Sequence, residues 1–215
     1  MSDRNDWVAL AKELGLEFKP GIDDLLESPS LQKMVAPELG IKDLSQAMKM
    51  LANPMVHSLL SKIFLGAATG FYQDLEFILY RGSSTSTRSF GQQTRYAVHI
   101  NVLFHKNQDM GLDMKAAWWG AKFGKAIMPN RYLPIPTNPE LDKLVVVKTA
   151  DASRTKLLLE RSDLATALLK MYQYSPKFHV TDHGIRYKES GRIIAADRAR
   201  IIMDLLAEAA EKFGR

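Results

Sequence analysis

Three arginines lie close together in the sequence, at Arg81, Arg88 and Arg95. Hydroxyl, amide and glycine residues separate them, and the stretch from the first to the last contains no Asp or Glu. A guanidinium group presents a planar fork of N–H donors that suits a phosphate or a carboxylate. We therefore expect an anion-binding surface on an exposed loop that connects two strands. The alternative is a solvated hairpin whose arginines bind nothing.

A second cationic group follows a pair of tryptophans. If residues 115–128 form a helix, its lysines lie on one side of it, beside Trp119: Lys115, Lys122 and Lys125. A basic amphipathic helix can contact an anionic membrane or another protein. We expect Trp118, Lys122 and Lys125 to form an interaction surface, although the same pattern fits buried aromatic residues beside solvated lysines. The sequence leaves open whether 115–128 is helix or strand.

Two histidines, His179 and His183, are four residues apart with Asp182 between them. This spacing suits zinc on a helix. Val180 and Gly184 instead indicate a strand followed by a turn, and residues four apart on a strand are separated by roughly 13 Å. The chain also has no cysteine to supply a thiolate. We therefore expect no metal site and no other cofactor.

No nucleophile and base stand together in a recognisable catalytic pattern. The sequence has no Gly-x-Ser-x-Gly motif and no dinucleotide-binding glycine pattern, and Gly120–Lys125 is too short for a phosphate loop. We expect a non-catalytic binding or interaction module. One alternative is a protein that binds anions or nucleic acid through the arginine loop, and a second is an enzyme whose site assembles from distant residues.

The composition is that of a globular chain. Of 215 residues, 46% are hydrophobic and 25% are charged, so a packed core is expected. We predict a single domain over residues 1–215, with the proline-rich stretch 128–142 as a candidate subdomain boundary. The net charge of +5 permits an anionic ligand. The N-terminus is polar and no apolar stretch has the length of a membrane span, so a cytoplasmic location is expected.

Helices and strands must position these residues, and the spacing of apolar residues along the chain shows where each kind of element is expected. Helical spacing dominates to about residue 64, beginning with a helix capped by Asp6 and ended by Gly15. Alternation then predicts strands near residues 75–80 and 96–104, a third at 110–114, and a fourth at 144–147. A helix from Ala152 restarts with Ser162 as its cap, and a hairpin follows over residues 178–188. The fold class is α+β, with N-terminal helices, an antiparallel sheet, a helix between strands and a closing C-terminal helix.

The closing helix has the clearest pattern, with Asp197 as its expected cap. Its apolar residues recur at helical spacing and predict a buried stripe: Ile201, Ile202, Leu205, Leu206, Ala209 and Phe213. Such a helix cannot bury its stripe alone. We expect it to cover one face of the sheet.

This order of elements resembles the type III secretion chaperone-like fold. The segment from Trp7 to Gly15 is similar to the opening helix of such proteins, and residues 168–213 are similar to their second half. The resemblance covers about half the chain. It implies a homodimer or a protein partner, since these small proteins dimerise and bind partner segments. They are acidic and this chain is basic, so their cargo-chaperone role does not carry over.

Overall fold

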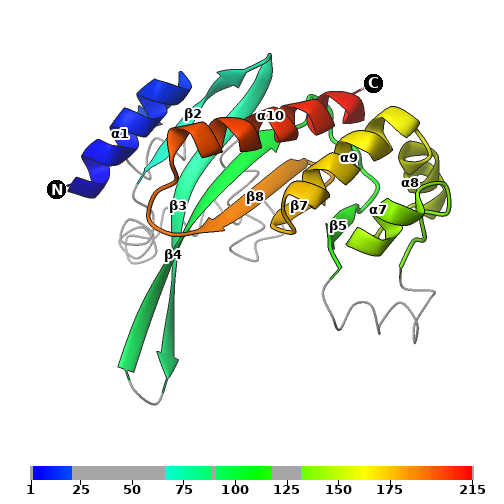
Figure 1. The fold of residues 1–215 in the computed structure, drawn as a ribbon, viewed down its shortest axis with the longest axis horizontal. Coiled ribbons are helices and arrows are strands. Elements are labelled where there is room, and N and C mark those ends of the chain that lie inside the picture. Colours follow the sequence, from blue (N-terminus) through cyan, green and yellow to red (C-terminus); the bar gives the residue numbers. More distant parts are fainter. Residues whose placement is uncertain (1, 21–65, 89–90, 118–131, 215) are drawn as a thin grey trace. The chain divides into compact units, whose positions relative to one another are not determined.

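The computed structural model describes residues 2–20, 66–88, 91–117 and 132–214 (Figure 1). The described helices are α1 (Ser2–Leu14), α7 (Pro139–Leu144), α8 (Ala152–Leu159), α9 (Ser162–Tyr174) and α10 (Ala196–Phe213). The described strands are β1 (Glu17–Lys19), β2 (Ala67–Tyr72), β3 (Leu75–Arg88), β4 (Gly91–Leu103), β5 (Asp113–Ala116), β6 (Val145–Lys148), β7 (Phe178–Thr181) and β8 (Gly184–Ser190). Most of the helices predicted before residue 65 lie outside the described residues.

These elements confirm the predicted α+β class. The eight described strands form an antiparallel sheet in the order β1-β2-β3-β4-β8-β7-β5-β6, and a helix closes the C-terminus. None of the described helices combines the length and the apolar character that a membrane crossing requires. The chain divides into two compact units: Met1–Phe71, Glu76–Ile100 and Glu189–Arg200 form the first, and Tyr72–Leu75, Asn101–Lys188 and Ile201–Arg215 form the second. The prediction of one domain stays a prediction.

In the first unit, α1 ends as its sequence predicts. Gly15 has a φ of +73°, which glycine adopts without steric cost. Its N–H donates to the carbonyl of Lys12, and the N–H of Leu16 donates to the carbonyl of Ala11. These two hydrogen bonds form a Schellman motif. The predicted start is wrong, because the helix begins at Ser2 and Asp6 lies within it.

The predicted loop over residues 81–95 is wrong for most of its length. β3 continues to Arg88 and β4 begins at Gly91, so a long hairpin replaces the connection. Polar residues suit this ribbon because the cross-strand hydrogen bonds satisfy its backbone, whichever side chains it carries. Near its base the rings of Tyr80 and His99 stack at a centroid distance of 4.6 Å. Burial raises the pKa of Tyr80.

In the second unit, four strands form a continuous ladder. β5 pairs with β6 through Lys115 and Val146, and β5 pairs with β7 through Lys115 and His179. β7 pairs with β8 through His179 and Arg186. Side chains alternate between the two faces of a sheet, so these residues form one row across four strands. The neighbouring residues of each strand point to the opposite face.

That opposite face is apolar and fully buried. It carries Val145, Val147, Met114, Phe178, Val180, Ile185 and Tyr187. Helix α9 packs against it, since the buried Tyr172 hydroxyl donates to the carbonyl of Met114 at 3.0 Å and its ring meets Phe178 edge-on. Burial raises the pKa of Tyr172. The face turned away from α9 is the polar one.

Several predicted boundaries in this unit need correction. The third strand begins at Asp113 and not at residue 110, because Gly111 has a φ of +63° that interrupts an extended chain. Part of the proline-rich stretch is helical, since α7 begins at Pro139 with Asn138 as its cap. Arg161 occupies the cap position of α9, so Ser162 is its first helical residue.

Helix α10 buries the stripe expected of it, with two differences. Ile202, Leu206 and Phe213 are buried as predicted, whereas Ile201 is 48% exposed and Met203 is fully buried in its place. Asp197 lies within the first turn, because the helix begins at Ala196.

Candidate functional site

The polar face of the second unit gathers cationic side chains from four adjacent strands. We call this set the basic face, and its members are Lys148 on β6, Lys115 on β5, His179 on β7, and Arg186 and Lys188 on β8. Neighbouring strands lie roughly 5 Å apart, so the charges follow one another across the sheet. Among the members of the ladder that share this face, Asp113 is the one carboxylate.

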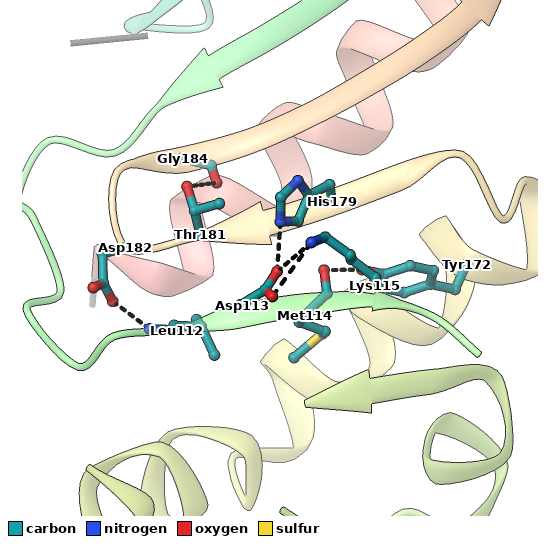
Figure 2. A network of polar contacts seen from close by, with 9 residues as sticks. All are labelled: Leu112, Asp113, Met114, Lys115, Tyr172, His179, Thr181, Asp182 and Gly184. Atoms are coloured by element: carbon teal, nitrogen blue, oxygen red, sulfur yellow. Dashed lines mark hydrogen bonds and ion pairs between the residues drawn. The ribbon is translucent and has the colours of Figure 1, made fainter. Parts of the chain in front are cut away.

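Asp113 lies within this set of cations and contacts two of them (Figure 2). Its Oδ1 is 2.7 Å from Nε2 of His179 and 3.0 Å from Nζ of Lys115. The hydrogen bond from His179, helped by Lys115, lowers the pKa of Asp113 to about 2, although burial acts in the opposite direction. The carboxylate is therefore ionised near neutral pH, and Nε2 of His179 must carry the hydrogen that it donates.

The basic face is accessible, though not uniformly. Lys148 and Lys188 are exposed, the Lys115 side chain is 55% exposed, and that of His179 is 25% exposed. Arg186 is half-buried, and burial lowers its pKa. An arginine stays protonated through such a shift because its ordinary pKa is so high. The face thus carries three lysines, an arginine and a histidine.

A carboxylate on the adjacent turn fixes the strand that carries Asp113 and Lys115. Asp182, between β7 and β8, accepts hydrogen bonds from the backbone N–H groups of Met110 at 3.1 Å, Gly111 at 2.7 Å and Leu112 at 3.0 Å. Three donors on one carboxylate hold the turn before β5 against the β7–β8 turn. The predicted turn at residues 182–184 is confirmed.

The site contains a histidine held by a carboxylate, a pair that also occurs in acid–base catalysis. A carboxylate that fixes one ring nitrogen of a histidine leaves the other nitrogen for proton transfer. In the part of the chain that the structure describes, the His179 ring contacts Asp113 and no hydroxyl nucleophile. The described residues also contain no cluster of three or more His, Asp or Glu side chains that could hold a metal ion. Binding through charge is what the arrangement supports best.

Of the three arginines singled out in the sequence, Arg81 and Arg95 do not share an exposed surface. Arg81 is 4% exposed in the first unit, and its guanidinium lies 5.2 Å from the centroid of the Tyr96 ring. Arg95 is exposed and adjoins Tyr96 in β4, so it points to the other face of the hairpin from that ring. Arg88 is the last residue of β3. The expectation of three exposed loop arginines is therefore wrong, whereas anion binding by any of them stays a prediction.

Tyr96 has a second cationic neighbour that the sequence did not suggest. The guanidinium of Arg192 lies 4.8 Å from the same ring centroid. The carbonyl of Arg192 accepts a hydrogen bond from the indole N–H of Trp7 at 3.2 Å, which ties it to helix α1 of the same unit. These contacts account for the arginines near Tyr96 as part of the packing of the first unit.

The structure does not test the second predicted surface. Trp118, Lys122 and Lys125 lie outside the described residues. Lys115, their neighbour in sequence, is in strand β5. The helix favoured for residues 115–128 is therefore wrong at its first two positions.

Sequence reasoning missed the basic face because its residues are scattered over residues 115–188. A local signal exists in the hairpin, where Phe178, Val180, Ile185 and Tyr187 are buried and the residues between them are polar. That alternation places His179 and Arg186 on one face. The partners from β5 and β6 depend on strand order, which no local pattern gives.

Comparisons with known proteins add no constraint on function. The chain matches no family model, no curated protein and no solved structure. The resemblance to type III secretion chaperone-like proteins stays a prediction.

Proposed function

We propose that this chain is a non-catalytic binding module that holds a phosphate-bearing polyanion on its basic face. One observation carries the proposal: the strand register puts Lys115, His179 and Arg186 side by side in one row. Lys148 and Lys188 extend the positive charge to either side. A cytoplasmic setting belongs to the same proposal, and a protein partner or a homodimer stays a prediction.

A sheet face is a suitable platform for such a ligand. Its side chains stand on a backbone held by hydrogen bonds, so the charges are fixed at strand spacing before the ligand arrives. A linear polyanion repeats its charge along its length and can neutralise several of these side chains at once. Each contact releases a counterion, so the affinity should fall steeply as salt rises.

The test uses three exposed lysines of the face and three exposed lysines of the helices. The face variant combines Lys115→Gln, Lys148→Gln and Lys188→Gln. The control variant has the same net charge and combines changes to Gln at exposed lysines of α7, α8 and α9: Lys143, Lys156 and Lys170. Binding of labelled linear inorganic polyphosphate is measured against salt concentration for both variants and for the parent.

In a plot of log affinity against log salt, the line for the face variant should be less steep than that of the parent by roughly two units. Each phosphate contact that is lost removes somewhat less than one unit of steepness. The control should keep the slope of the parent, and all three proteins should be fully folded at the assay temperature. Equal losses in both variants would mean that net charge alone attracts the ligand. That result, or no binding by the parent at low salt, would refute the proposal.

A further inference from the structure

An aromatic ring lies at the edge of the basic face. The Nζ of Lys148 lies 5.8 Å from the centroid of the Tyr132 ring. The next residue, Leu133, donates its N–H to the carbonyl of Val147 at 2.9 Å, which holds this segment beside β6. Tyr132 is half-buried. The ammonium group of Lys148 therefore lies within cation–π distance of the Tyr132 ring.

The position of Asp113 is a second feature that a bare polyanion does not explain. A carboxylate among cations repels a ligand that consists of negative charge alone. It accepts hydrogen bonds from His179 and Lys115, and a carboxylate has about four lone-pair directions. The remaining ones can accept from an N–H group of an unpaired nucleobase, such as the imide N–H of thymine.

We propose that the ligand of the basic face is a single-stranded nucleic acid, with Tyr132 as a stacking surface for one base. This inference rests on the proposed function and narrows its ligand class. Proteins that bind single strands combine a cationic surface for the backbone with aromatic side chains on which the bases stack. The row of Lys115, His179 and Arg186 supplies the first of these and Tyr132 supplies the second. In a duplex the bases are stacked within the helix, so the ring would have no partner.

The experiment compares three labelled ligands: an oligothymidine of about 12 nucleotides, the duplex of the same length, and linear polyphosphate. The informative variant is Tyr132→Leu, which keeps an apolar side chain and removes the π-face. Tyr132→Phe keeps the ring. Tyr174→Leu removes a different exposed tyrosine, on α9, where the side chain is 42% exposed.

We expect Tyr132→Leu to weaken binding of the oligothymidine by roughly fivefold or more and to leave polyphosphate binding within about twofold. Tyr132→Phe and Tyr174→Leu should bind the oligothymidine as the parent does. The parent should bind the single strand more tightly than the duplex.

Three results would overturn the inference. The first is equal weakening of oligothymidine and polyphosphate binding by Tyr132→Leu, and the second is no weakening at all. The third is a duplex bound as tightly as the single strand. None of these three results contradicts a loss of polyphosphate binding in the lysine variant of the face. The single-strand inference can therefore fail while the proposed polyanion binding is upheld. A parent that binds none of the three ligands would refute both.

Discussion

At the scale of single residues, the contacts of Asp113 make the stability of the fold depend on the ionisation of its carboxylate. Its carboxylate is held by His179 at 2.7 Å and by Lys115 at 3.0 Å. Both partners favour the ionised form, and the pKa falls from 3.8 to about 2. A group whose pKa is lower in the folded state stabilises that state above its unfolded pKa. The contribution is lost as the pH falls from about 4 to about 2.

We expect Asp113→Asn to reduce the free energy of unfolding at neutral pH by about 1 kcal/mol. The carboxylate is 36% exposed, so solvent screening reduces the value that the pKa shift alone would give. The difference between parent and variant should shrink as the pH falls from 4 to 2, because the parent carboxylate becomes protonated there. Urea titrations over this pH range measure it.

The matched control is Asp6→Asn, at an exposed position of α1. It should change the free energy of unfolding by less than about 0.5 kcal/mol at every pH. A difference for Asp113→Asn that stays constant from pH 7 to pH 2 would show that the ionic contacts of Asp113 contribute nothing.

At the scale of elements, the helix α10 shows what periodicity can and cannot specify. The spacing of Leu205, Leu206 and Phe213 predicts a buried stripe, and all three are buried. Ile201 is at the edge of that stripe, and its burial depends on whether a neighbouring element reaches so far around the helix. The sequence has no signal for that, because the neighbouring segments are distant in the chain.

Two adjacent isoleucines of α10 provide a matched pair. Ile202 is 0% exposed and Ile201 is 48% exposed. Ile202→Ala should lower the free energy of unfolding by about 2–5 kcal/mol, since it leaves a cavity in a packed core. Ile201→Ala should change it by less than about 0.5 kcal/mol, because alanine is a good helix former and little contact is lost. Denaturant unfolding of both variants tests the burial of the helix.

The outcome that contradicts this burial is easily recognised. Similar losses in the two variants would mean that Ile201 is buried together with Ile202, as the sequence predicts. A loss confined to Ile201→Ala would mean that α10 packs with a different face from the one described.

The hairpin of β3 and β4 shows a different limit of sequence reasoning. The core part of each strand alternates apolar and polar residues and was predicted. The remainder, from Gly82 onward, is polar on both sides, so alternation cannot distinguish a strand from a loop there. The ribbon persists because its two strands satisfy each other's backbone groups. Arg81 illustrates the consequence, since a residue assigned to a loop is in fact buried in β3.

At the scale of the whole molecule, the candidate site depends on contacts between segments far apart in the chain. The class of the fold, the closing helix and the 178–188 hairpin could be predicted, because each has a local pattern. The basic face could not, because β5 lies between β6 and β7 in the sheet although β7 follows 62 or more residues later. Strand order arises from the packing of the complete core, and a single sequence does not display it.

Asp182 is a decisive long-range link, because its carboxylate joins residues 70 to 72 positions apart in the chain. Asp182→Asn keeps the size of the side chain, but its amide N–H₂ group would face backbone donors. We expect a loss of about 2–3 kcal/mol in the free energy of unfolding, since the half-buried N–H groups of Met110 and Leu112 lose a charged acceptor. The amides of Met110, Gly111 and Leu112 should also exchange hydrogen faster in the native state, and polyphosphate should bind more weakly because β5 carries Lys115.

The control for this link is Asp109→Asn, in the turn before β5 that Asp182 binds. Asp109 is exposed and has a φ of +50°, which asparagine tolerates well. It should therefore leave stability, exchange and binding near those of the parent. If the two variants behave alike, the three hydrogen bonds do not hold β5 in place, and the register that forms the basic face must come from the strand ladder and its apolar packing. If Asp182→Asn lowers stability without changing polyphosphate binding, the turn supports the fold but the ligand does not depend on the position of β5.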